Sequence, residues 1–363
     1  MTYIFVTNQF MTGGVERVFL NIASNIPDKN ILLLPIHKKY DENLLKQLPK
    51  NVSLIENDKY PLNGIFSFFN LFRLAAYINK KIINNPQEFC VINFSDTIST
   101  ILVSYFIKAK RHLSWCHCNP NAYFNSKYFF LYKKFLKRFD NIVCICNTQK
   151  KEFCKVFGKS FLERILLCFN LTDLKIIDSL KNEKISFDKD YILMVARFDN
   201  RSKDFYTLID AYKKLDSDLK DKYSLVLVGN GEDFEKIKQH ALCSGESERI
   251  VFTGLQKNPY AWMKNAKVFV LSSKSEGFPL VINEALSCDC PVISSDCIAG
   301  PRDIFEDEKY GLLFDVGNVD MLVNKLTQLL TDKNIYSMYK SLARKRVEEI
   351  NLKAIESLNK IFI

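Results

Sequence analysis

The chain has 363 residues, which exceeds the usual size of one hydrophobic core and is typical of two domains. Hydrophobic residues make up 47% and charged residues 25%, which excludes a disordered chain. The formal net charge is +10, and residues 1–170 carry the excess, with 23 Lys and Arg against 11 Asp and Glu. Such a basic half favours a polyanionic or membrane-surface partner.

The first half alternates short apolar runs with amphipathic stretches. Its opening segment, "MTYIFVTNQF", lacks the basic and apolar regions of a secretory signal, and no run of about eighteen apolar residues follows. We therefore expect a cytoplasmic protein. The predicted strands cover residues 3–7, 30–36, 52–56, 89–94, 112–116, 141–146 and 163–168, and the predicted helices include 13–26 and 95–109.

The same alternation restarts near residue 190, after the charged segment "SLKNEKISFDKD". Its predicted strands cover residues 190–197, 223–229, 249–254, 266–273 and 290–295, with helices at 204–215, 231–242 and 259–266. Continuous apolar strands between amphipathic helices are typical of parallel sheets covered on both faces. We predict an α/β fold with Rossmann-like domains at 1–175 and 191–345, a linker at 176–190, and a helix at 346–363 that packs back toward the N-terminal domain.

Eleven cysteines are present, an odd number that argues against a secreted disulfide framework. Three pairs have Cys-x-Cys spacing: Cys116/Cys118, Cys144/Cys146 and Cys288/Cys290. Zinc ribbons usually need Cys-x2-Cys, and the four histidines supply no matching spacing. We expect reduced, mostly buried thiols and no metal site.

The candidates for chemistry lie on strand-to-helix loops, because ligands of open α/β sheets bind at the carboxyl ends of the strands. In "RFDNRSKDF", Arg197 ends a predicted strand and Lys203 stands near the next helix. Two cations at a helix N-terminus suit a diphosphate. The alternative is a pair of solvated loop cations.

A second loop, "SEGFPLVINEALS", places Glu276 before a helix and Glu284 on it. Pro279 fits the first turn of that helix. A carboxylate in such a place accepts hydrogen bonds from a ribose diol or another sugar hydroxyl. Either glutamate alone also fits an ordinary solvated surface, whereas the turn, the proline and the spacing together are more specific.

These segments resemble retaining glycosyltransferases of the GT-B fold, specifically glycosyltransferase family 4. The likeness covers residues 190–320 and rests on "ILMVARFDNRSKDFYTLIDAY", "LVLVGNGED", "EGFPLVINE" and "AGPRDIFEDEKYGLLFDVGN". It implies two domains facing across a cleft, Arg197 and Lys203 on the donor diphosphate, Glu276 on the transferred sugar and Glu284 on the ribose. The backbone that meets phosphate or sugar oxygens would be that of Gly277, Phe278, Pro279, Leu280 and Val281. The family's usual Lys-Gly is Lys203-Asp204 here, which should alter the loop more than its charge.

The first half resembles the family more loosely. In "MTGGVERVFLNIA", Gly13 and Gly14 would let the backbone approach the donor phosphate, although a tight turn also explains them. In "SWCHCNP", His117 follows a strand, where the family often has a histidine near the reacting sugar. A structural role for His117 is the alternative.

One stretch of the basic half, "YFNSKYFFLYKKFLKRFD", has an amphipathic helical pattern. Between Tyr128 and Phe139 the apolar residues share one face and the lysines share the other. Such a helix lies on an anionic membrane or packs its apolar face on the sheet. An acceptor on an isoprenoid diphosphate or a lipid-anchored glycan would explain the membrane reading.

These observations predict a retaining, metal-independent glycosyltransferase that needs no cofactor. Its donor would be a nucleotide diphosphate sugar, with UDP favoured, and it would move a hexosyl or N-acetylhexosaminyl group. The acceptor would be a glycan or polyprenyl-diphosphate-linked glycan of bacterial surface polysaccharide synthesis, such as capsule, O-antigen or lipopolysaccharide. The alternatives are a nucleotide-sugar epimerase of the same fold and a non-catalytic binding protein. The aromatic residues at helical spacing argue against nucleic acid as a partner.

Overall fold

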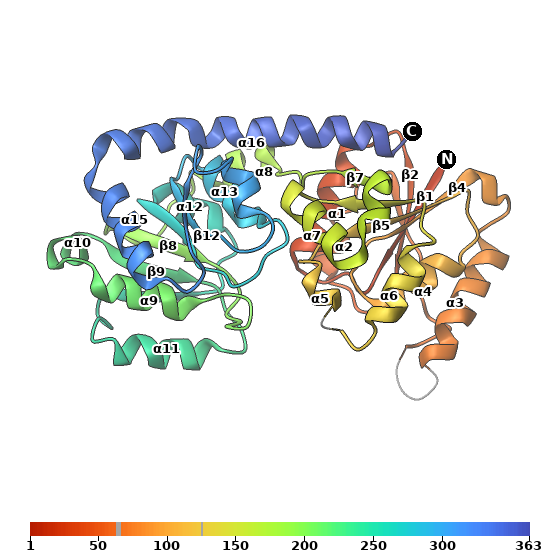
Figure 1. Ribbon diagram of the computed structural model, residues 1–363, viewed down its shortest axis with the longest axis horizontal. Helices are drawn as coiled ribbons and strands as arrows, with labels where there is room; N and C mark the ends of the chain where they lie inside the picture. Colours follow the sequence, from red (N-terminus) through yellow and green to blue (C-terminus); the bar gives the residue numbers. More distant parts are fainter. Residues whose placement is uncertain (63–66, 125) are drawn as a thin grey trace. The chain divides into compact units, whose positions relative to one another are not determined.

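The computed structural model describes residues 1–62, 67–124 and 126–363 (Figure 1). The chain forms two compact units. Unit 1 consists of Met1–Leu171 with Lys353–Ile363, and unit 2 of Thr172–Leu352. The segment predicted as a linker, 176–190, therefore belongs to unit 2 and begins inside a helix, α8 (Leu174–Leu180). The reason is that Asp173 caps this helix by accepting a hydrogen bond from the Ile176 N–H at 3.1 Å.

Unit 1 is built on a seven-stranded parallel sheet with strand order β3-β2-β1-β4-β5-β6-β7. All seven strands lie where the apolar runs predicted them. They are β1 (Thr2–Thr7), β2 (Asn30–Pro35), β3 (Val52–Leu54), β4 (Phe89–Asn93), β5 (Arg111–Cys116), β6 (Asn141–Cys144) and β7 (Ile165–Leu167). The helices are α1 (Gly14–Asn25), α2 (Glu42–Leu45), α3 (Ser67–Lys81), α4 (Ile98–Phe106), α5 (Asn121–Phe124), α6 (Phe129–Leu136) and α7 (Asn147–Phe157), with short 3-10 turns at Pro86–Glu88 and Lys159–Arg164.

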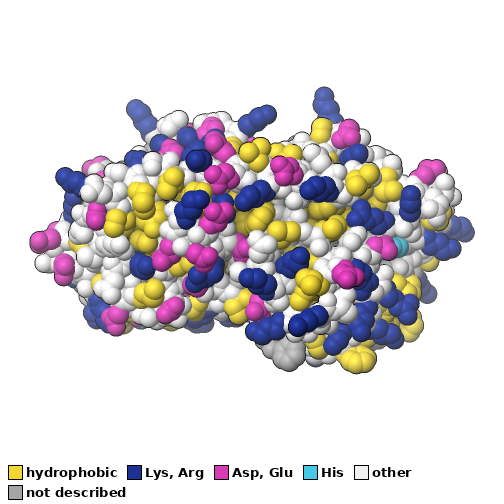
Figure 2. All heavy atoms as spheres, turned by 45° about the horizontal axis from the view of Figure 1, so that its top comes forward, with side chains coloured by type: hydrophobic (Ala, Val, Ile, Leu, Met, Phe, Trp, Pro, Cys, Tyr) yellow, Lys and Arg dark blue, Asp and Glu magenta, His cyan; other side chains and the backbone are white. Residues whose placement is uncertain are grey.

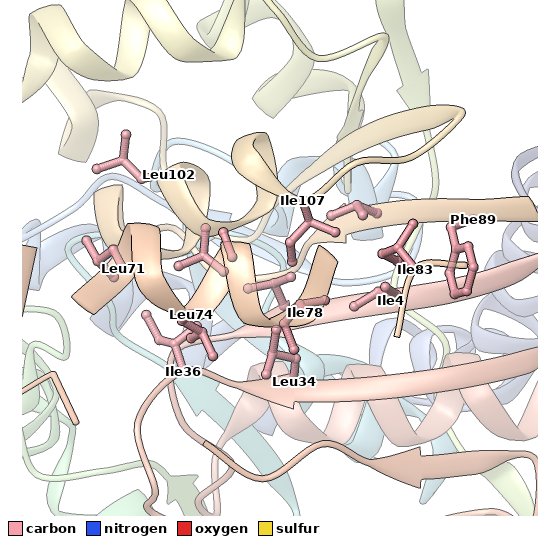
Figure 3. Close-up of a cluster of buried hydrophobic side chains, with 14 residues drawn as sticks. Ile4, Leu34, Ile36, Leu71, Leu74, Ile78, Ile83, Phe89, Leu102 and Ile107 are labelled. Carbon is pink, nitrogen blue, oxygen red and sulfur yellow. The ribbon is translucent and has the colours of Figure 1, made fainter. Parts of the chain in front are cut away.

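A core of unit 1 lies between this sheet and the helices α3 and α4 (Figure 3). Leu74 and Ile78 of α3 point toward Ile4 of β1 and Leu34 of β2 (Figure 3). Each of these four side chains is at most 1% exposed. Burying one such aliphatic side chain stabilises the fold by about 2 kcal/mol, so the predicted strands are held by their continuous apolar character.

The predicted amphipathic helix over Tyr128–Phe139 is shorter, since α6 ends at Leu136. Three residues of its apolar face, Tyr132, Leu136 and Phe139, are buried in a core cluster of unit 1 with side chains of α7. These three side chains pack on the core, as the packing alternative expected, and contact of this helix with a membrane stays a prediction.

Unit 2 is built on a six-stranded parallel sheet with strand order β10-β9-β8-β11-β12-β13. The strands are β8 (Tyr191–Val195), β9 (Ser224–Val228), β10 (Ile250–Gly254), β11 (Val268–Leu271), β12 (Val292–Ser295) and β13 (Leu312–Phe314), of which the last was not predicted. Besides α8, the helices are α9 (Phe205–Lys214), α10 (Ser217–Lys222), α11 (Phe234–Cys243), α12 (Pro259–Asn265), α13 (Leu280–Ser287), α14 (Pro301–Phe305) and α15 (Val319–Thr331). The last helix, α16 (Lys333–Ile361), begins in unit 2 and ends in unit 1. The α/β class with two Rossmann-like domains is confirmed.

The end of the chain belongs to unit 1. Phe362 packs edge-on against Tyr3, with ring centroids 4.9 Å apart, and the Tyr3 hydroxyl donates to the Ile363 carbonyl at 3.0 Å. The Arg111 guanidinium donates to the Ile361 carbonyl at 2.9 Å. Within the described ranges no helix is long and apolar enough to cross a membrane.

Candidate active site

The strand order of unit 2 brings two predicted loops together. Strands β8 and β11 are adjacent at the point where the order of the strands reverses, with Leu193 in register with Phe269. The loop after β8 carries Arg197 and Lys203, and the loop after β11 carries Glu276. Ligands of doubly wound sheets bind in the crevice at such a switch point. The geometry therefore favours a binding site here.

Lys203 and Glu276 form an ion pair and hydrogen bond between these loops. The side chain of Lys203 is 18% exposed and that of Glu276 is 12% exposed. Glu276 Oε1 also accepts from the Ser273 hydroxyl at 2.6 Å, and Lys203 makes an antiparallel backbone bridge with Ser273. The two charges are thus held in place before any ligand arrives.

Arg197 is much more accessible, with a side chain that is 73% exposed. Its Nη2 atom lies 3.0 Å from Oδ2 of Asp199. Asp199 also accepts from Arg201, and although burial opposes the effect, the hydrogen bonds from Arg201 lower the pKa of Asp199. The loop therefore keeps Asp199 ionised beneath two mobile guanidinium groups.

The loop of Gly277, Phe278 and Pro279 leads into α13. Pro279 is the residue before the helix, with φ −70°, and Leu280 is its first residue. No side chain of the described residues caps this helix, so its first N–H groups are directed at the switch point. A Cβ atom on Gly300 would lie 2.5 Å from Pro279 Cδ and 3.0 Å from the Gly277 carbonyl oxygen. Glycine is therefore required where the loop after β12 packs against this turn.

Glu284 lies on the second turn of α13 and is half-buried. Its Oε1 atom is 3.5 Å from the Tyr260 hydroxyl of α12. Val281 precedes it by three residues, so the two side chains are neighbours on one side of the helix. Within unit 2 the structure thus places Arg197 and Lys203 on the loop after β8, residues 275–279 on the loop after β11, and Glu284 on the helix that follows, and it joins Lys203 to Glu276.

Two glycines of the neighbouring loop, Gly229 and Gly231, allow a close approach of backbones. A Cβ atom on Gly229 would lie 1.9 Å from the Ala196 carbonyl oxygen, and one on Gly231 would lie 2.3 Å from the Phe198 carbonyl oxygen. These contacts fix the path of the loop after β8. A glycine pair alone is a weak sequence signal, and only the structure gives it this role.

In unit 1, Gly13 and Gly14 lie at the start of α1, after β1. Gly13 is the residue before the helix and Gly14 its first residue. Gly13 has an extended φ of −170°, which any residue adopts. A Cβ atom on Gly14 would meet nothing within 4 Å. A Cβ atom on Gly13 would lie 2.7 Å from Glu16 Oε2, so packing within this turn favours glycine at position 13 but not at position 14. The approach of a ligand to this helix N-terminus remains a prediction.

His117 follows β5 and has a buried ring nitrogen, Nε2, with no partner among the residues that the structure describes. Burial lowers the pKa of His117 to about 3, so the ring is neutral near pH 7. Its backbone N–H donates to Asp96 Oδ2 at 3.0 Å. Sequence reasoning missed Asp96, because it follows a different strand, β4, and has no motif around it.

The carboxylates near Arg197 do not form an open metal site. Asp199, Glu232 and Asp233 come together, but they are paired with Arg197, Arg201 and Lys236. All eleven cysteines are free thiols. A second group with metal-binding spacing, formed by Asp96, Cys116 and Cys118, lies in unit 1.

Comparisons with known proteins bear on the family and the fold of the chain. Residues 176–346 match the family "Glycosyl transferases group 1". The chain is 28% identical over 353 residues to a Campylobacter jejuni enzyme named N-acetylgalactosamine-N,N'-diacetylbacillosaminyl-diphospho-undecaprenol 4-alpha-N-acetylgalactosaminyltransferase, covering 93% of this chain and 92% of that protein. It is 34% identical over 119 residues to the lipopolysaccharide 1,6-galactosyltransferase of Salmonella typhimurium, covering 32% of this chain and 33% of that protein.

Solved structures share the fold along the whole chain. The apo form of the lipopolysaccharide outer core galactosyltransferase WaaB has a TM-score of 0.75 at 20% identity, covering 100% of this chain and 99% of that one. HepE of Anabaena, in complex with UDP and glucose, has a TM-score of 0.78 at 20% identity, covering 99% of each chain. The fold is therefore that of the GT-B glycosyltransferases.

The fold and the match of residues 176–346 indicate the class of protein, a glycosyltransferase built on two Rossmann-like domains. The family match lies in unit 2, where residues 176–346 resemble the glycosyl transferases of group 1. The chain is a glycosyltransferase, as the resemblance of its second half implied.

Proposed function

We propose that the chain is a retaining, family 4 glycosyltransferase that uses a UDP-sugar. The observation that carries the proposal is the Lys203–Glu276 ion pair at the switch point of unit 2, next to the N-terminus of α13. The pair places a cation next to a carboxylate. The cation suits the diphosphate of a nucleotide-sugar donor, and the carboxylate suits the hydroxyl groups of its sugar. The UDP and glucose found with HepE support UDP as the nucleotide.

In this proposal each group has one task. Lys203 and Arg197 bind the diphosphate, whose negative charge grows as the sugar leaves, and the N-terminus of α13 stabilises the same charge. Glu276 accepts hydrogen bonds from the transferred sugar, and Glu284 accepts them from the ribose. For His117, Gly13 and Gly14 of unit 1, contacts with the reacting sugar and the phosphate stay predictions that the family resemblance implies. The acceptor hydroxyl attacks from the face that the diphosphate leaves, which retains the anomeric configuration.

The reaction in this form needs no metal ion and no cofactor. Two protein cations and the N-terminus of α13 supply the positive potential that a divalent ion supplies in other transferases. The three carboxylates near Arg197 are already paired with cations, which supports the same conclusion.

The acceptor is proposed from the relatives. The Campylobacter enzyme is named for a diphospho-undecaprenol acceptor, and the Salmonella enzyme for lipopolysaccharide. Both names describe lipid-linked glycans of the bacterial surface. We propose an acceptor of this class, with a hexosyl or N-acetylhexosaminyl group transferred to it.

Such an acceptor favours a peripheral protein at the inner face of the cytoplasmic membrane. The outer face of α6 carries Phe130, which is 79% exposed, with Lys134 one turn further along and Lys137 beyond the helix end. Phe68 and Phe69 of α3 are 53% and 65% exposed. Figure 2 shows mostly Lys and Arg among the charged side chains on the surface of unit 1. Exposed aromatic rings among cations suit an anionic lipid surface.

Calorimetric titration with UDP, GDP and their sugars tests the donor site. We expect micromolar binding of UDP that weakens by about 1–3 kcal/mol in Glu284→Ala, the scale of losing a charged hydrogen-bond partner. The matched control is Glu248→Ala, an exposed glutamate of the same unit. Equal binding in both variants would contradict the site. The anomeric configuration of the product, read by NMR, then tests retention and distinguishes transfer from epimerisation.

Co-sedimentation with anionic vesicles tests the membrane surface. Lys134→Glu combined with Lys137→Glu should release the protein, whereas Lys213→Glu combined with Lys238→Glu, on exposed positions of unit 2, should not. Unchanged sedimentation of the first variant would contradict the peripheral reading.

A further inference from the structure

Three side chains of types that bind metal ions converge in unit 1. Asp96 follows β4, and Cys116 and Cys118 flank His117 at the end of β5. One carboxylate oxygen and the two Sγ atoms lie within 4.8 Å of one another. In a tetrahedral zinc shell, ligand atoms are about 3.5–4 Å apart, so small side-chain adjustments close the site around an ion.

The backbone that carries the two cysteines is fixed by a buried side chain. Gln149, which is fully buried, donates from Nε2 to the Cys116 carbonyl at 3.1 Å and to the Cys118 carbonyl at 2.8 Å. The Tyr132 hydroxyl donates to the Asp96 carbonyl at 3.3 Å. Outer contacts of this kind hold metal ligands in place and determine affinity.

The site lacks a cation. The Asp96 carboxylate accepts from the Tyr123 hydroxyl and the His117 N–H, and it hydrogen bonds to Cys118. None of these partners, in the part of the chain that the structure describes, carries a positive charge. A buried carboxylate without a cation is costly in its ionised form. A bound divalent ion would supply the missing charge.

We propose that Asp96, Cys116 and Cys118 bind one zinc ion, with the fourth position open to a water molecule. Two sulfur ligands and one oxygen ligand favour zinc over magnesium or calcium. Each thiol gives its proton to the solvent as it binds. Because both thiols must lose a proton to bind the ion, binding weakens as the pH falls.

The ion would act on the shape of the loop and not on the donor. It joins the loop after β4 to the loop after β5, and His117 lies between its two sulfur ligands. The inference does not depend on the proposed function, because it requires no nucleotide. It also departs from the sequence expectation of no metal site, since the third ligand comes from a distant loop.

Titration of the reduced full-length chain with Co²⁺ tests the proposal, because cobalt bound to thiolates absorbs in the near ultraviolet. We expect one Co²⁺ per chain with this absorption, displaced by Zn²⁺. Cys116→Ser and Cys118→Ser should each weaken binding by at least about tenfold and reduce the absorption, as loss of a ligand requires. Cys243→Ser, at an exposed cysteine of unit 2, is the control and should bind as the wild type does. Affinity and absorption in Cys118→Ser equal to those of the wild type would overturn the proposal.

A second measurement uses the unmodified chain, in case a variant fails to fold. Zn²⁺ should protect Cys116 and Cys118 from maleimide, with the modified positions identified by mass spectrometry, while Cys243 stays reactive. Equal modification of Cys118 with and without Zn²⁺ would overturn the proposal.

Discussion

Glu276→Gln should tighten the binding of UDP while it slows transfer. In the donor-free protein the Glu276 carboxylate occupies Lys203, the cation that we assign to the diphosphate. UDP brings a second anion to the same cation, and the two anions repel each other. Glutamine has nearly the same shape as glutamate. Its Oε1 atom can still accept the hydrogen bond that the Ser273 hydroxyl donates to Glu276 Oε1 at 2.6 Å in the wild type. The substitution therefore removes the charge and little else.

The magnitude follows from the burial of the pair. Two unit charges about 4 Å apart interact by about 4 kcal/mol near a protein surface. Lys203 is 18% exposed and Glu276 is 12% exposed, so solvent and salt screen part of this energy. If about a third of this interaction energy opposes the binding of UDP, Glu276→Gln should strengthen UDP binding by about 1.4 kcal/mol, which lowers the Kd about tenfold. Lys203→Met should have the opposite effect and weaken the binding of UDP by about 100-fold. It removes the cation that attracts the diphosphate, and Glu276 loses its ion pair with Lys203.

Calorimetry with UDP on the wild type, both variants and the double variant measures these effects. Lys238→Met, at an exposed lysine of α11, is the control and should bind as the wild type does. The transfer rate with the full donor should fall in Glu276→Gln, since the sugar loses a charged acceptor. Weaker UDP binding in Glu276→Gln than in the wild type would refute the competition between carboxylate and diphosphate.

Three further outcomes are expected. Gly300→Ala should weaken UDP binding about tenfold, because its Cβ atom would clash with Pro279. Gly317→Ala is the control, because Gly317 has a similar positive φ of +77° but open space around it. Equal losses of UDP binding in the two variants, measured by calorimetry, would contradict the clash. Arg346→Met should lower the free energy of unfolding, measured in urea, by about 3 kcal/mol, since the buried guanidinium donates to the carbonyls of Asp303 and Ile304 at 2.8 and 2.7 Å. The neighbouring Lys345→Met is the control and should have little effect. A similar loss of stability in both variants would argue against a contribution from these hydrogen bonds. For His117, the folded pKa of about 3 lies below the unfolded value of about 6.5, so the unfolded chain binds the extra proton and stability falls as the pH drops through this window, by about 2 kcal/mol at pH 5. His117→Gln should remove this part of the acid loss between pH 7.5 and pH 5 in urea unfolding, and an unchanged difference would show that the ring is accessible.

The sheets were predictable because their strands are buried on both faces. A run such as that of β1 or β8 is apolar throughout, and few other structures tolerate it. Strand β13, with three residues, is too short to give such a pattern. Its place is determined by pairing with β12, in which Ser294 is opposite Leu313. A contact between distant segments of this kind leaves no local signal.

The sequence correctly predicted an amphipathic helix at α6, but it did not determine what the apolar face of this helix contacts. Periodicity shows that Tyr132 and Leu136 share a face, and both a lipid surface and a protein core satisfy it. The decision came from α7, whose Phe153 and Phe157 lie in the same buried cluster. Asp96 escaped notice for a related reason. Its importance comes from the adjacency of β4 and β5, which brings it to His117 from 21 residues away.

The departure from the family's Lys-Gly at Lys203-Asp204 has a physical explanation in the structure. Asp204 has a φ of −102°, so the backbone needs no glycine at this position. Its carboxylate accepts from the Thr207 N–H at 3.4 Å and the Thr207 hydroxyl at 2.8 Å, which caps α9. Its own N–H donates to the Ser272 carbonyl at 2.6 Å, next to the residue that holds Glu276. The aspartate thus fixes the start of α9 and ties the loop of Lys203 to the end of β11. Since Asp204 is buried and faces the helix, it adds no exposed negative charge beside Lys203. The loop therefore keeps the position of Lys203 that the proposed function requires, with a helix cap in place of the conformational freedom of glycine.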